Sequence, residues 1–276
     1  MTRRQALAAT GAVLATTVLG RNRAAAAHDG PLFDAHIHYN DDIAAILKPA
    51  EAVQRLRDAG IARAIVSSTP DDLTLDLHAA APDLVLPFLR PYRSHADRTG
   101  WIENKDVLAE MERRLDRTAY RGIGEFHLYP LAPQGSSLSR IVHLAKERRL
   151  WILAHVSAAV IDQMYRLDAD ARIIWAHAGG LVEDADTVGS YVARYPGLVI
   201  ELSLRSGLVA GDNVTDQWRA IFETARGRVL LGTDTWVNSR WDEVGAVAAH
   251  ARRWLASLPA PLAAEIASGN GRRMFG

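Results

Sequence analysis

Two histidines, His36 and His38, stand two residues apart at the end of an apolar run near the start of the chain. Side chains of a β-strand alternate between its faces, so these imidazoles would point one way and Phe33, Ala35 and Ile37 the other. Neutral imidazole is the commonest metal ligand, and two of them on rigid backbone form half of a coordination sphere. A bare His-x-His also occurs on ordinary surface strands, so the other candidate ligands decide.

Four more side chains of the metal-binding type follow apolar runs further along the chain: Glu125, His155, His177 and Asp234. A divalent ion held by imidazole and carboxylate, with one position open, lowers the pKa of bound water from about 15.7 to about 7. Asp234 could accept the proton of that water and hand it to a leaving group. His177 could bind a second ion or polarise a scissile carbonyl. The expected catalytic residues are therefore Asp234 and His177, and the alternative is a set of unrelated polar side chains.

Three side chains near the ends of these runs are candidates for substrate binding: His127, Arg205 and Trp236. His127 shares a strand face with Glu125, one step nearer the loops. Arg205 could bind a substrate carboxylate through two hydrogen bonds, or form a structural ion pair with a carboxylate such as Glu201. Trp236 could line the pocket or serve in packing. Four other histidines are expected at the surface: His78, His95, His143 and His250.

Eight strand-like apolar runs alternate with amphipathic helical segments along the chain. The strands are expected at 32–38, 61–68, 84–89, 123–128, 151–156, 172–177, 198–204 and 229–234. The helices are expected at 48–60, 73–81, 106–115, 138–149, 160–167, 186–193, 218–224, 241–255 and from 262.

The spacing of these runs predicts the fold class. The ends of the first and eighth runs, His38 and Asp234, are 196 positions apart, a mean of 28 residues per repeat. This is close to the roughly 30 residues of one βα unit. The sequence therefore predicts a single-domain α/β protein, a (β/α)8 TIM barrel with its metal site at the carboxyl ends of the strands. A doubly wound sheet is the competitor, but no Gly-x-Gly-x-x-Gly follows the first strand.

Five short motifs together resemble the amidohydrolase superfamily, in its amidohydrolase-2 branch of metal-dependent barrel hydrolases. They are Asp34–His38, Ala154–His155, Ala176–Gly180, Gly232–Thr235 and Gly269–Phe275. The resemblance covers essentially the whole mature chain. It implies a distorted barrel that holds one or two divalent ions, usually zinc, with Asp234 as the proton shuttle.

Glu125 is the residue on which the number of ions depends. Many amidohydrolase-2 proteins lack a ligand on the fourth strand, whereas two-metal relatives carry a carboxylated lysine or a glutamate there. We expect two ions that share Glu125. The first would be held by His36, His38, Glu125 and Asp234, and the second by Glu125, His155 and His177. Alternatively, Glu125 forms an internal ion pair with an arginine such as Arg90 or Arg205.

Composition excludes several classes of protein. Of the 276 residues, 49% are hydrophobic and 23% charged, which is typical of a globular protein. The formal net charge is zero, so nothing indicates a general affinity for nucleic acid or anionic membranes. There is no cysteine, and therefore neither a disulfide nor a lipoprotein anchor.

The first 27 residues predict an export signal. Arg3 and Arg4 precede an uncharged run from Ala6 to Gly20, which is shorter than the roughly 20 residues of a membrane span. More arginines and four alanines follow, ending at Ala27. This order is typical of a twin-arginine signal cleaved after Ala27. We expect residues 28–276 to form the barrel and to reach the periplasm or the exterior.

These observations favour an exported metal-dependent hydrolase that activates water on zinc to cleave a small amide, lactone or ester. One alternative is a non-oxidative decarboxylase of an aromatic or related carboxylic acid, favoured if one ion binds and Glu125 is paired internally. Another is a TatD-like nuclease, against which the lack of a basic groove in the composition argues. The expected partners are a small-molecule substrate and the export machinery, without nucleic acid, and a homo-oligomer is left open.

Overall fold

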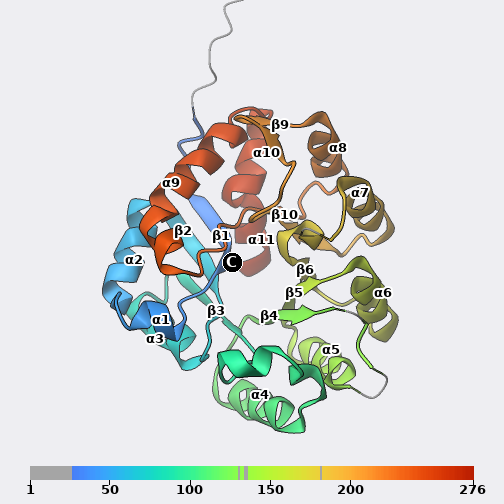
Figure 1. Ribbon diagram of the computed structural model, residues 1–276. Helices are drawn as coiled ribbons and strands as arrows, with labels where there is room; N and C mark the ends of the chain where they lie inside the picture. The colour runs from blue at the N-terminus through green and yellow to red at the C-terminus, as the bar shows by residue number, and fades with distance from the viewer. Residues whose placement is uncertain (1–26, 130, 134–135, 181) are drawn as a thin grey trace, which may run out of the picture.

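The computed structural model describes residues 27–129, 131–133, 136–180 and 182–276. Eight parallel strands form a nearly closed barrel whose neighbours follow the order of the sequence (Figure 1). They are β1 Leu32–Ile37, β2 Ile61–Val66, β3 Val85–Leu89, β4 Gly122–Leu128, β5 Trp151–Val156, β6 Ile173–Trp175, β7 Val199–Glu201 and β10 Val229–Leu230. A parallel bridge between Ile37 and Thr235 joins β1 to the segment after β10. The predicted (β/α)8 barrel is therefore confirmed.

Helices surround the ring of strands, except that the last of them, α11, lies at its centre (Figure 1). They are α1 Asp41–Ala44, α2 Pro49–Asp58, α3 Asp72–Ala80, α4 Lys105–Arg117, α5 Ser137–Arg148, α6 Ala158–Leu167, α7 Ala185–Arg194, α8 Asp216–Thr224, α9 Asn238–Leu255, α10 Ala260–Ala264 and α11 Asn270–Phe275. Short 3-10 turns lie at η1 His95–Arg98, η2 Trp101–Glu103 and η3 Ala176–Gly179, and a π-helical turn at η4 Glu265–Gly269. A small hairpin, β8 Val209–Ala210 and β9 Asn213–Val214, follows β7.

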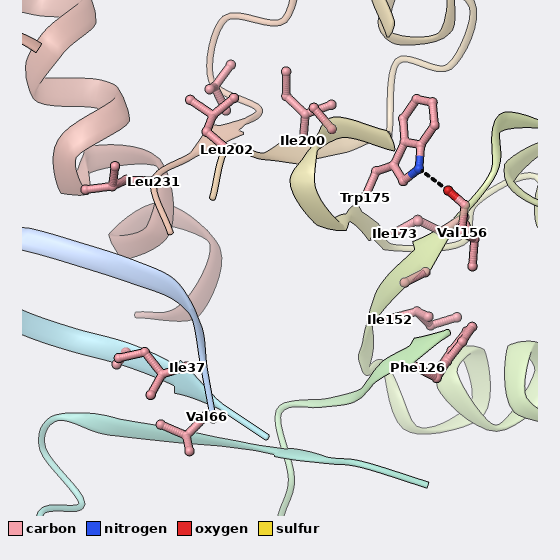
Figure 2. Close-up of a cluster of buried hydrophobic side chains, with 14 of the residues drawn as sticks. Ile37, Val66, Phe126, Ile152, Val156, Ile173, Trp175, Ile200, Leu202 and Leu231 are labelled. Carbon is pink, nitrogen blue, oxygen red and sulfur yellow. Dashed lines mark hydrogen bonds between the residues drawn. The ribbon is translucent and has the colours of Figure 1, made fainter. Parts of the chain in front are cut away.

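The outer core lies between strands and helices. Figure 2 shows side chains from neighbouring strands, such as Ile152, Ile173 and Ile200, gathered in this layer. The indole N–H of Trp175 donates to the Val156 carbonyl at 2.8 Å, which leaves this buried polar group satisfied. No helix in the described ranges is long and apolar enough to cross a membrane.

A smaller apolar cluster fills the inside of the barrel, and the end of the chain closes it. The ring of Phe275 lies with its centroid 5.7 Å from Phe33, 6.0 Å from Phe88 and 5.6 Å from Trp151. Figure 1 places the C-terminus at the centre of the ring of strands. Because Phe33 and Trp151 lie in the first two residues of their strands, this plug seals the amino-terminal end of the barrel. The polar interior is therefore confined to the carboxyl end.

The structure departs from the predicted alternation in β1. Phe33 and Ala35 belong to the inner cluster, whereas Ile37 packs in the outer core. The prediction that these three share one face is wrong, because the register between β1 and β2 shifts between Asp34 and Ile37. Such an irregularity re-aims the side chains that follow it. The predicted export signal, apart from Ala27, lies outside the described residues.

Candidate metal centre

The six predicted ligands, from five strands, meet at the carboxyl end of the barrel: His36, His38, Glu125, His155, His177 and Asp234. Nε2 of His36 lies 3.1 Å from Nε2 of His38. Glu125 presents Oε1 at 3.5 Å from the first nitrogen and Oε2 at 3.3 Å from the second. Oδ1 of Asp234 lies 3.7 and 3.5 Å from the same two nitrogens. Nε2 of His177 lies 3.6 Å from Oε1 of Glu125.

Hydrogen bonds at the far side of three rings fix their tautomers. Nδ1 of His38 faces the carbonyl oxygen of Ser67, and Nδ1 of His177 lies 3.0 Å from that of Ser203. A carbonyl oxygen only accepts, so both Nδ1 atoms carry the proton. Nδ1 of His36 lies 2.9 Å from a carboxylate oxygen of Glu201. The Nε2 lone pairs of all three rings are therefore directed at the same region, as metal-binding histidines require.

This donor set fits a divalent cation. Two lone-pair nitrogens 3.1 Å apart repel each other unless a proton or a cation lies between them. Burial lowers the pKa of His36, but Glu125, Asp234 and Glu201 together raise it well above its usual value. A concentration of negative charge around one imidazole is the field that a bound cation neutralises. Imidazole nitrogen and carboxylate oxygen are the ligands that zinc and similar ions prefer.

A second group lies beside the first. Nδ1 of His155 is 2.9 Å from Oε1 of Glu125, and Nε2 of His127 is 3.7 Å from the same oxygen. These three side chains bring one ligand atom each within 4.8 Å of one another. Burial lowers the pKa of His127 to about 3, so its ring is neutral. Glu125 thus stands between the pair His36 and His38 on one side and the pair His127 and His155 on the other.

Glu125 also forms the ion pair that was the alternative to a bridging role. Nη2 of Arg90 lies 2.9 Å from Oε2, and Nε of Arg90 donates to the Glu125 carbonyl at 3.2 Å. Arg205, the other arginine considered, makes no such contact with it in the described chain. Burial raises the pKa of Glu125, but the neighbouring histidines, above all His127 and His36, lower it by more. The net result is a pKa well below its usual value. The carboxylate is therefore ionised at neutral pH.

Irregular backbone carries the ligands that follow β6 and β10. His177 has φ 55° and Asp234 has φ 47°, values in the left-handed region that non-glycine residues rarely adopt. Such strain concentrates at functional sites. Gly232 precedes Asp234 because a Cβ there would lie 2.8 Å from Cδ of Glu201 and 3.1 Å from Cβ of His36. Only glycine leaves room for Glu201 to reach His36.

The ligands open into a cavity of about 480 Å³. This volume is in the range of small-molecule sites, roughly 300 to 1,000 Å³. The lining comprises His38, Asn40, Thr69, Arg90, Tyr92, His95, Arg98, Glu125, His127, Tyr129, His155, His177, Gly180, Val182, Leu204, Asp234 and Trp236. A buried polar cluster at the base of a cavity on this end of a barrel is the arrangement of a barrel enzyme.

Comparison with known families decides which kind of enzyme this is. The amidohydrolase family model, Amidohydro_2, matches residues 29–276. The chain belongs to the amidohydrolase-2 family. It is an enzyme of the amidohydrolase superfamily, with a metal-dependent hydrolase activity or a related one. No curated protein matches the sequence.

Solved structures share the fold of this amidohydrolase at low identity. A candidate 2-pyrone-4,6-dicarboxylic acid hydrolase from Pseudomonas putida is 15% identical, with 89% of this chain and 97% of that chain covered and a TM-score of 0.55. A TatD family hydrolase from Entamoeba histolytica is 12% identical, covered over 89% and 98%, with a TM-score of 0.57. Amidohydrolase 2 from Bifidobacterium longum subsp. infantis is 16% identical, covered over 88% and 98%, with a TM-score of 0.54. These likenesses show the barrel alone.

The three predicted substrate-binding residues of the amidohydrolase lie in different places. His127 and Trp236 line the cavity. Arg205 does not, because its guanidinium donates to the carbonyls of Ala178, Gly180 and Glu183 and lies over the ring of Trp218. The expectation that Arg205 binds a substrate carboxylate finds no support in this position. Nor does Arg205 pair with Glu201, whose carboxylate instead holds His36.

Several residues of the site were missed or misplaced by the sequence patterns. Glu201 was considered only as an ion-pair partner of Arg205, and its bond to His36 joins residues 165 positions apart. His95 is exposed, as expected, but η1 also brings it and Arg98 to the edge of the cavity. No local pattern marks these residues, because each of them meets the site through contacts with segments far away in the sequence. The only sequence feature that could have indicated a place in the cavity is the positive charge of Arg98 among other polar residues.

Proposed function

We propose that this amidohydrolase cleaves a small amide, lactone or ester with divalent metal ions, zinc in our proposal, at the base of the cavity. The observation that carries the proposal is the position of Asp234 between the metal ligands and the cavity. Oδ1 of its carboxylate lies 3.5 Å from Nε2 of His38, and the side chain lines the cavity and is 10% exposed. A carboxylate in this position can hold a proton beside the metal ligands and face the substrate at the same time.

The chain's residues divide the chemistry. His36, His38 and Asp234 would hold the first ion, and Glu125 would be shared with a second ion. A bound divalent ion supplies Lewis acidity, which acidifies water and polarises a carbonyl. Asp234 would accept a proton from the attacking water on Oδ2, the oxygen not directed at His36 and His38, and release it to the leaving group. Arg240 fixes this carboxylate's segment, because its Nε donates to the Asp234 carbonyl at 2.7 Å.

A second candidate function is the non-oxidative decarboxylation of an aromatic or related carboxylic acid. The ion pair between Arg90 and Glu125 favours it, because a glutamate neutralised by an arginine is less suited to share two cations. The cavity volume supports a small molecule over nucleic acid as substrate for either activity. A TatD-like nuclease is accordingly the weakest of the three proposals.

The first experiment measures metal content and activity together. Elemental analysis of the purified protein is compared with that of His38→Ala and of His143→Ala, a matched control with an exposed histidine on α5. We expect His38→Ala to lose metal and hydrolysis of lactones, esters and amides while keeping its circular dichroism spectrum. Full metal content in His38→Ala would exclude the proposed site. Turnover of aromatic acids alone, with one ion per chain, would establish the decarboxylase instead.

We also propose that residues 1–27 direct export by the twin-arginine route and that the mature protein begins at His28. The test replaces Arg3 and Arg4 by lysine, with Arg21 and Arg23 replaced by lysine as the control. We expect only the first double variant to stay unprocessed in the cytoplasm. Normal processing of that variant would exclude this route.

A further inference from the structure

Exposed apolar side chains gather around the catalytic cavity. Among the described residues six large apolar side chains are exposed, and four of them line the cavity: Tyr129, Val182, Leu204 and Trp236. Val182, Leu204 and Trp236 are exposed by 62%, 52% and 44%. Single exposed apolar residues are ordinary, whereas a group around one cavity marks a binding surface. These three residues, called the apolar wall below, follow β6, β7 and β10, which are consecutive in the barrel.

The opposite side of the cavity is polar. Thr69 follows β2, and Arg90, His95 and Arg98 follow β3. In the ring of eight strands, β2 and β3 lie four places from β6 and β7, which is across the barrel. The cavity therefore has an apolar side and a polar side, with the metal ligands at its base. A substrate that fits both sides is amphipathic.

Leu204 has an unfavourable backbone conformation that its neighbours hold in place. Its φ of 52° is in the left-handed region, which a leucine rarely adopts. Its neighbours on both sides are fixed: the Ser203 carbonyl faces Nδ1 of His177, and Arg205 donates to carbonyls of the loop after β6. A strained backbone that presents an exposed leucine to the cavity indicates a role in binding.

We propose that the apolar wall binds an uncharged apolar substituent, an acyl chain or an aryl ring, of the molecule whose carbonyl reacts at the cavity base. The inference rests on the proposed hydrolase function and adds a substrate class to it. Val182, Leu204 and Trp236 are in this view specificity residues that contact substrate without taking part in bond cleavage. Small hydrophilic amides and esters without such a substituent would be poor substrates.

The primary test is equilibrium binding, which does not require turnover. Straight-chain carboxylates from acetate to octanoate are titrated into the metal-loaded protein by calorimetry. We expect the dissociation constant to fall by up to about fourfold for each added methylene that contacts the wall. Leu204→Asn keeps the number of side-chain heavy atoms and their branching and tolerates the left-handed backbone, and Val182→Thr is close to isosteric. Both should flatten this dependence on chain length.

Ile46→Thr is the matched control, because Ile46 is 66% exposed but does not line the cavity. It should leave the dependence on chain length as in the wild type. An affinity independent of chain length in the wild type, or an equal dependence in Leu204→Asn, would overturn the apolar wall. So would a loss of self-association in Leu204→Asn with unchanged binding, because the wall would then be a contact between copies.

A parallel assay separates this inference from the proposed function. Acyl esters and alkyl-substituted lactones of increasing chain length are offered to the same proteins. Chain-length-dependent binding without any hydrolysis would refute the hydrolase and leave the apolar wall standing. Hydrolysis with kcat/KM independent of chain length would refute the wall alone.

Discussion

Nη2 of Arg90 lies 2.9 Å from Oε2 of Glu125, and both side chains are almost completely buried. Nη1 of the same arginine lies 3.4 Å from Nδ1 of His38. Arg90 thus supplies a fixed positive charge within the cluster that is expected to bind cations. Its presence makes Glu125 the residue at which the hydrolase and the decarboxylase differ.

Glu125→Gln tests whether Glu125 is shared between two ions. An amide oxygen coordinates weakly, so the variant should fall from two ions towards one by elemental analysis. Hydrolysis should fall by at least about 10- to 100-fold, the loss seen even for residues that only orient ligands. Glu243→Gln, at an exposed glutamate on α9, is the control. One ion in the wild type, with metal and turnover unchanged in Glu125→Gln, would make the decarboxylase the leading function.

The ligand positions were predictable because each one follows an apolar run that forms a barrel strand. Parallel strands of a barrel end on one face. The sequence pattern alone therefore predicts that His155 and Asp234 approach His36. Helices were predictable from their own periodicity: the helix expected at 241–255 corresponds to α9, whose buried residues Trp241, Val244 and Ala248 recur at helical spacing.

The partners of the ligands could not be predicted. The prediction for β1 failed at Ile37, which packs in the outer core, because a register shift is set by the neighbouring strand. The role expected for Arg205 relied on its charge, whereas its donors are used by backbone carbonyls about 25 residues away in sequence. Arg90 was one of two arginines considered for Glu125, and only the folded loop after β3 selects it. Charge and alternation do not encode such long-range choices.

Glu201→Gln should weaken metal binding through His36. Burial raises the pKa of Glu201, but His36 and His177 lower it by more, to about 2. The residue is therefore an ionised carboxylate. Its Oε2 lies 2.9 Å from Nδ1 of His36 and accepts the His177 backbone N–H at 3.1 Å. Chelator competition should show a loss of metal affinity of about 10- to 100-fold. Glu223→Gln on α8 is the exposed control, and an unchanged affinity in Glu201→Gln would exclude this orienting role.

Asp71 should make stability depend on pH. Burial raises its pKa to about 6, against hydrogen bonds from Tyr120 and Arg114 that lower it. The usual value is 3.8, so the carboxyl group is protonated more readily in the folded chain than in the unfolded chain. Its stabilising contribution is complete below the unfolded pKa and is lost as pH rises through about 6. Wild type should therefore lose up to about 3 kcal/mol relative to Asp71→Asn between pH 4 and 7.

The neighbouring Asp72 provides a control of opposite sign. A side-chain hydrogen bond from Arg114 lowers its pKa, so its contribution is present at neutral pH and is lost as pH falls. Denaturant unfolding at several pH values measures both differences. Parallel curves for wild type and Asp71→Asn would contradict the raised pKa of Asp71.

Arg90→Met tests the ion pair between Arg90 and Glu125 by removing the arginine. Removing one partner of a buried ion pair leaves an uncompensated charge and costs about 3 to 5 kcal/mol, so the metal-free variant should unfold more easily than the metal-free wild type. A bound cation would compensate the charge of Glu125, so added zinc should raise the melting temperature of Arg90→Met by more than that of wild type.

The metal content of Arg90→Met distinguishes the two candidate functions. If Arg90 restricts the wild type to one ion, the variant should take up a second ion at Glu125. If two ions already share Glu125, the content stays at two. Arg93→Met is the control: Arg93 is 45% exposed in its ion pair with Asp97, so its loss should change neither quantity by much. Equal zinc stabilisation of Arg90→Met and wild type would show that the Glu125 carboxylate does not face a bound cation.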